Sequence, residues 1–72
     1  MNDAVFKFII SRIVEKSKDA VSEAEENVGQ EYYDGRKFAY YEVLDSIKSE
    51  LEVRDENLSE YGLDFDLESA LL

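Results

Sequence analysis

Two long stretches of the chain repeat their apolar side chains with the period of an α-helix, and one glycine, Gly29, separates them. In the first stretch the recurring side chains are Phe6, Ile10, Ile13, Ser17, Ala20 and Ala24. In the second stretch they are Tyr33, Tyr40, Leu44, Ile47 and Leu51. A helix with this spacing presents one apolar face to a core. The pattern predicts helices over about 3–28 and 31–53, because glycine commonly follows the last residue of a helix.

The composition favours an all-α chain that forms one helical domain over residues 1–72. The sequence contains no proline and only three glycines, so few residues would interrupt a helix. Two helices of similar length joined by a short break predict an antiparallel two-helix hairpin. Two helices are too thin to enclose a core by themselves. We therefore expect dimerisation to complete a helical bundle.

A pair of small residues, Gly35 and Ala39, lies one turn apart in the second helix. Glycine within a helix costs about 1 kcal/mol relative to alanine, which favours a compensating contact. When the chain is folded about residues 28–30, Ala24 falls opposite Gly35 and Ala20 falls opposite Ala39. We therefore expect the two helices to cross closely near the turn. The alternative interpretation is a turn at Gly35, with the helix beginning at the next residue.

Residues 55–72 form a C-terminal arm of a different character, with six acids and no base. Its apolar side chains are Leu58, Leu63, Phe65, Leu67 and Leu71. Because such a set is not expected to remain in water, we predict that the arm docks at the open end of the hairpin, near Phe6 and Leu51. Phe65 is expected to be the chief anchor. The alternation of apolar and acidic residues leaves two local structures open, an extended segment or a short helix capped by Asp64 or Asp66.

Five aromatic side chains crowd residues 32–41, more than one face of a hairpin can cover. Phe38 and Tyr41 point away from the apolar stripe of the second helix. Tyrosine and phenylalanine are enriched in the cores of protein interfaces. We therefore predict that Tyr32, Phe38, Tyr41 and Phe65 contribute to an interface between two copies of the chain. The alternative is that the arm covers these aromatic side chains within one copy.

No catalytic, cofactor-binding or metal-binding residue is predicted. The chain has no histidine and no cysteine, which excludes disulfides and disfavours a structural zinc site. Asp64, Asp66 and Glu68 resemble part of a calcium loop, but Ser69 stands where that loop requires glycine. No pattern marks a pocket of paired acidic and basic groups, so we expect no enzymatic activity.

The formal net charge of −10 is concentrated in the arm, which contributes −6. An acidic surface repels phosphates, so we expect no direct binding to nucleic acid. No apolar run is long enough to span a bilayer and no signal peptide is evident, which predicts a soluble, cytoplasmic protein without membrane binding. These expectations favour a small interaction or regulatory module, a homodimer that also binds a protein partner. The alternative is an acidic decoy that imitates nucleic acid and occupies a DNA-binding protein.

Two segments resemble those of a group of short uncharacterised bacterial helical proteins. They are Gly-Arg-Lys-Phe-Ala-Tyr-Tyr-Glu-Val-Leu at residues 35–44 and Gly-Leu-Asp-Phe-Asp at residues 62–66. The resemblance covers roughly the second half of the chain. It implies a compact helical hairpin and no particular chemistry.

Overall fold

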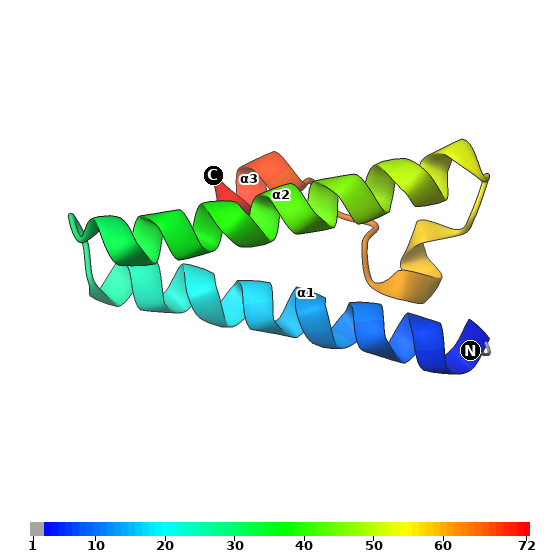
Figure 1. The fold of residues 1–72 in the computed structure, drawn as a ribbon, viewed down its shortest axis with the longest axis horizontal. Coiled ribbons are helices and arrows are strands. Elements are labelled where there is room, and N and C mark those ends of the chain that lie inside the picture. Colours follow the sequence, from blue (N-terminus) through cyan, green and yellow to red (C-terminus); the bar gives the residue numbers. More distant parts are fainter. Residues whose placement is uncertain (1–2) are drawn as a thin grey trace.

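The structure is a computed structural model, and it describes residues 3–72. Its elements are α1 (Asp3–Glu26), α2 (Glu31–Val53), a 3-10 helix η1 (Leu58–Tyr61) and α3 (Leu67–Leu71). The two long helices lie side by side and the chain reverses between them, so the expected all-helical hairpin is confirmed (Figure 1). α1 ends at Glu26 rather than at residue 28, whereas α2 occupies the range 31–53 without a break at Gly35. The alternative turn at Gly35 is therefore wrong.

The turn between the long helices depends on a left-handed glycine. Gly29 has φ +85°, a conformation that is strained for residues with a Cβ atom. The side-chain amide of Asn27 donates to the Glu23 carbonyl at 2.8 Å, which satisfies one of the free carbonyls at the end of α1. The backbone amide of Gln30 then donates to the Asn27 carbonyl at 3.1 Å. These bonds close the reversal within four residues and start α2 directly afterwards.

The expected close crossing of small residues is wrong, because α2 is rotated away from it. Ala20 and Ala24 are buried at 1% and 6% exposure, as expected. Gly35 and Ala39, however, are exposed, and a Cβ built on Gly35 would meet nothing within 4 Å. The buried side of α2 is instead centred on Leu44, with partly buried tyrosines one turn before it. The small residues of α1 are therefore buried, whereas those of α2 face solvent.

This rotation predicts opposite outcomes for two alanines. Ala20→Leu should overpack the buried seam and lower the free energy of unfolding by about 1–3 kcal/mol. Ala39→Leu should change it by less than about 0.5 kcal/mol, because the new side chain would extend into solvent. Urea denaturation of both variants beside the parent measures the difference. Equal losses in the two variants would contradict the observed rotation of α2.

The C-terminal arm packs as a second layer against one side of the hairpin, as expected for a docked segment (Figure 1). The prediction that Phe65 is its chief anchor is wrong, because Phe65 is only partly buried. The deepest side chains of the arm are Tyr61, Leu63, Leu67 and Leu71, each at most 4% exposed. The three leucines are spaced four residues apart, so the turn before α3 and α3 itself keep them on the side that faces the hairpin.

The arm also reaches farther along the hairpin than its open end. The ring of Tyr61 makes an edge contact with Phe6, with 6.2 Å between ring centroids, and this contact lies at the open end as expected. α3 lies nearer the middle, where Leu71 and Phe65 line a recess with Ser17 and Val21 of α1. The arm therefore covers much of one long side of the hairpin.

The link from α2 to the arm turns on a non-glycine residue in the left-handed region. Asp55 has φ 56°, and the amide of Glu56 donates to the Leu51 carbonyl at 3.0 Å. This pattern is a Schellman motif, in which glycine is the preferred residue at the Asp55 position.

Asp55→Gly should therefore stabilise the fold. It removes a Cβ atom from a left-handed backbone and a negative charge from the negative end of the α2 dipole. We expect a gain of about 0.5–1 kcal/mol in the free energy of unfolding. Thermal and urea unfolding of Asp55→Gly beside Asp55→Ala measure the gain, and a glycine variant less stable than the alanine variant would contradict this role.

Candidate interaction surface

The side of the hairpin that carries the arm is held by polar contacts as well as by apolar packing. The Lys48 ammonium donates to the Phe65 carbonyl at 2.7 Å. The Lys7 ammonium lies 3.4 Å from the Glu60 carboxylate and 5.7 Å from the centre of the Tyr61 ring. The hydrogen bond with Glu60 is the main reason that the pKa of Lys7 is raised. This side of the hairpin is thus already occupied by the chain itself.

The Asp66 carboxylate caps α3, which confirms one of the two caps expected from the sequence. It accepts from the Glu68 amide at 3.0 Å, from the Ser69 amide at 3.4 Å and from the Ser69 hydroxyl at 3.0 Å. The hydroxyl bond, followed by the amide bonds, lowers the pKa of Asp66 from its usual value of 3.8. Each of these bonds favours the ionised carboxyl.

The lowered pKa predicts an acid-sensitive contribution to stability. A carboxyl whose pKa is lower in the folded state stabilises the fold fully above its unfolded pKa of about 3.9 and loses this effect as the pH falls through the folded pKa. Asp66→Asn keeps an oxygen acceptor but cannot titrate. The parent should therefore lose more stability than Asp66→Asn between pH 6 and pH 2.5, as measured by urea denaturation at each pH. Parallel losses in both proteins would show that the cap does not titrate in this way.

The four residues predicted to form an interface do not share one surface. Tyr41 and Phe65 are partly buried and pack against the core on the arm side. Tyr41 lines a recess with Leu67 and Glu68 of α3. Burial, followed by the nearby acids Asp45 and Glu68, raises the pKa of Tyr41. Phe38 is 48% exposed and lies next to Tyr41, with 6.0 Å between ring centroids. Tyr32 is 71% exposed and contacts Tyr33 near the turn, away from the other three.

The larger uncovered apolar surface lies on the other side of the hairpin. Successive residues of a helix are 100° apart, so the residues of each long helix that flank the buried seam fall on two opposite sides. Lys7 and Val21 of α1, with Tyr41 and Lys48 of α2, contact or border the arm. We call the opposite side the open face. It is formed by Phe6, Ile9 and Ile13 of α1 and by Tyr40, Val43 and Ile47 of α2.

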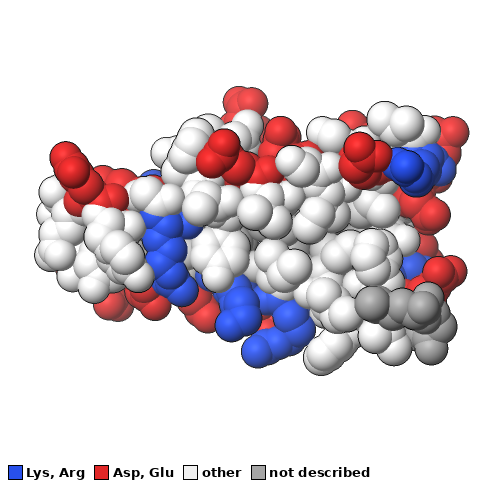
Figure 2. All heavy atoms as spheres, in the orientation of Figure 1, with Lys and Arg blue, Asp and Glu red and all other residues white. Residues whose placement is uncertain are grey.

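The open face has both projecting and recessed apolar side chains. Ile9 is 41% exposed and Val43 is 49% exposed. Near the open end of the hairpin an apolar recess is lined by Phe6, Ile47 and Leu51, with Ser46 and the stems of charged side chains at its edge. Figure 2 shows uncharged atoms over much of this face, along the junction of the two long helices. The arm reaches this surface only at Phe6, through the edge contact of Tyr61, and leaves Ile9 and Val43 exposed.

Two ion pairs lie at the ends of the open face. Arg36 of α2 bridges to Glu23 of α1 near the turn, and its guanidinium lies 5.7 Å from the centre of the Tyr40 ring. Arg54 pairs with Glu50 beside the apolar recess, as the i,i+4 spacing favours. The charges of each pair cancel, and Lys16, seven residues after Ile9, adds an exposed cation beside the face, although the whole chain carries a net charge of −10.

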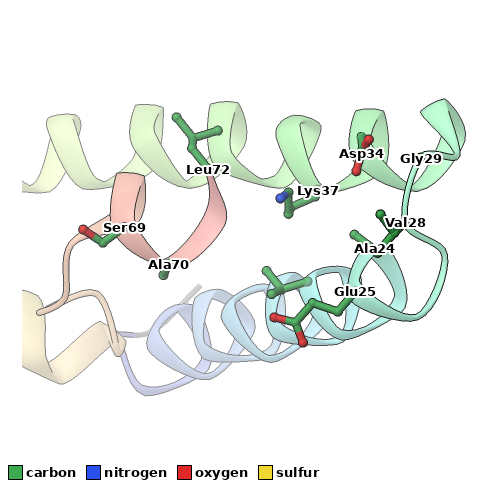
Figure 3. Close-up of a pocket in the computed structure, with 10 residues that line it drawn as sticks. Ala24, Glu25, Val28, Gly29, Asp34, Lys37, Ser69, Ala70 and Leu72 are labelled. Carbon is green, nitrogen blue, oxygen red and sulfur yellow. The ribbon is translucent and has the colours of Figure 1, made fainter.

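A second recess lies between the long helices near the turn, beside α3 (Figure 3). Ala24 lines it from α1, Val28 from the turn, Lys37 from α2, and Ala70 and Leu72 from the end of the chain. This recess lies on the same side of the hairpin as the arm. Its charged groups are Glu25 of α1 and Asp34 and Lys37 of α2, and we assign it no chemistry.

Across residues 3–72, no three His, Cys, Asp or Glu side chains are placed to hold a metal ion together. None of the helices in the described part combines the length and the apolar character needed to cross a membrane. The chain matches no protein-family model, no curated protein and no solved structure. The resemblance to short bacterial helical proteins therefore stays a prediction.

Proposed function

We propose that this chain is a small protein–protein interaction or regulatory module without catalytic activity, and that the open face is the surface it offers to a partner. The proposal is carried by the contrast between the two sides of the hairpin. The arm buries Leu63, Leu67 and Leu71 on one side, whereas Ile9 and Val43 remain exposed on the other. A contiguous apolar patch of this kind on a small soluble domain is typical of an interaction site.

Site-specific photo-crosslinking tests this proposal in the cells that produce the protein. A photoreactive phenylalanine analogue at Val43 should yield covalent adducts, because this position faces the partner. The matched control is Val53, which is 79% exposed in the same helix but lies off the open face. Adducts from position 43 and none from position 53 are expected. No adduct from position 43, or the same adducts from both positions, would contradict the proposal.

The acidic decoy makes a different prediction for the same adducts. A decoy would contact its target through carboxylates, so its complex should dissociate steeply as salt is raised. A complex formed through the open face should be nearly insensitive to salt, because its contacts are apolar. Formation of the position-43 adduct at 50 mM and at 500 mM salt therefore separates the two functions.

A further inference from the structure

We infer that the partner on the open face is a second copy of this chain. The two hairpins would pack face to face as a core of four long helices, with both arms on the outside. This inference rests on the proposed function, since it names the partner for the same surface. It also explains the one-sided position of the arm, because each hairpin would then be covered on both of its sides.

The size of the face fits a dimer. The molecule extends 39 by 20 by 15 Å along its principal axes, and the open face lies across the two longer ones (Figure 2). The two longer extents enclose a rectangle of 39 × 20, or about 780 Å², which is an upper limit on the flat area of the open face and is of the same order as the roughly 800 Å² that each partner contributes to a stable interface. A single helix laid on the face would cover only the strip between α1 and α2. A second hairpin of the same length and width would cover all of it.

The shape of the open face also suits contact with the same face of a second copy. In a two-fold dimer the same surface serves both partners, so it must carry both projections and recesses. The recess lined by Phe6, Ile47 and Leu51 lies on the same face as the projecting Ile9 and Val43. One surface therefore supplies both of the shapes that an isologous contact requires.

Electrostatics permit this contact despite the acidity of the chain. Two bodies with a net charge of −10 each repel one another, unless the acids lie away from the surface of contact. Six of the acids belong to the arm, which packs on the opposite side of the hairpin. The pairs Arg36–Glu23 and Arg54–Glu50 leave the two ends of the open face near neutral. A contact through this face therefore keeps the acids of the two arms away from each other.

Sedimentation velocity of the purified full chain tests the inference. At micromolar concentration the parent should sediment with twice the 8.3 kDa mass of one chain. Ile9→Glu and Val43→Glu should each weaken dimerisation by more than tenfold, because each places an unpaired charge in the apolar contact. Both residues are partly exposed, so the helical circular dichroism should be retained.

Two controls separate the open face from other surfaces. Phe8 is 66% exposed and points away from the open face, although it is the neighbour of Ile9 in the sequence. Phe8→Glu should therefore leave the dimer intact. Phe38→Glu should also leave the dimer intact. A dimer that is lost in Phe38→Glu but retained in Val43→Glu would place the contact on the aromatic side of α2. A parent that sediments as a single chain at all concentrations would overturn the second copy as the partner. Photo-crosslinking from position 43 would still test the proposed function in that case. An adduct whose mass differs from that of two chains would show that the partner is a different protein.

Discussion

Removal of residues 55–72 should leave the remaining hairpin unfolded or aggregated. The arm buries four large side chains, and burial of each contributes about 1.5–3 kcal/mol, whereas a typical domain is stable by only about 5–15 kcal/mol. Its loss would also bare Leu44, which is completely buried in the full chain. Far-ultraviolet circular dichroism and binding of a hydrophobic dye should show lost helix and exposed apolar surface. Removal of Leu72 alone is the matched control, because this residue is 59% exposed and should be dispensable. A hairpin that stays soluble and melts like the parent would show that the arm is not part of the core.

Leu63→Ala should be the most damaging single truncation within the arm. Leu63 is completely buried, so its loss should lower the free energy of unfolding by about 2–5 kcal/mol through lost burial and a residual cavity. Phe65→Ala should cost less, although phenylalanine is larger, because Phe65 is only partly buried. Urea denaturation of both variants gives the order directly. A larger loss for Phe65→Ala would restore Phe65 as the anchor of the arm.

The helices and their caps could be predicted from the sequence because each depends on local chemistry. Apolar periodicity and a single glycine at position 29 are sufficient to locate both long helices to within a few residues at their ends. Asp66 could be identified as one of two possible caps, because a carboxylate before a short apolar run satisfies free amides of the first turn. Docking of the arm followed from the number of its apolar side chains.

The rotation of α2 about its axis could not be predicted, because it depends on packing between elements. The stripe from Tyr33 to Leu51 was identified, but Gly35 and Ala39 lie outside it, and their small size suggested a contact that does not form. In the structure the arm occupies one side of the seam, where the Lys48 ammonium donates to the Phe65 carbonyl. A small residue permits a close approach but does not require one.

The predicted interface residues stay a prediction, but they do not lie together on the open face. Aromatic content drew attention to Phe38 and Tyr41, and the arm covers part of Tyr41 in the structure. The signal for the open face was the width of the apolar arc on α1, where Ile9 and Val14 extend it on opposite sides of Ile10. Such an arc is too wide for one neighbouring helix, and the arm packs on the side of Val14 only. Ile9 remains on the side that the chain itself does not cover.

Contacts across the open face can be observed directly by NMR on a sample that mixes ¹³C-labelled and unlabelled chains. Isotope-filtered nuclear Overhauser effects in such a sample arise only between copies. A dimer through the open face predicts intermolecular effects from the methyl groups of Ile9, Val43 and Ile47, and none from those of Leu63 and Leu67, whose neighbours belong to the same chain. Intermolecular effects confined to Leu63 and Leu67, or none from the open-face methyls, would contradict a second copy on this face.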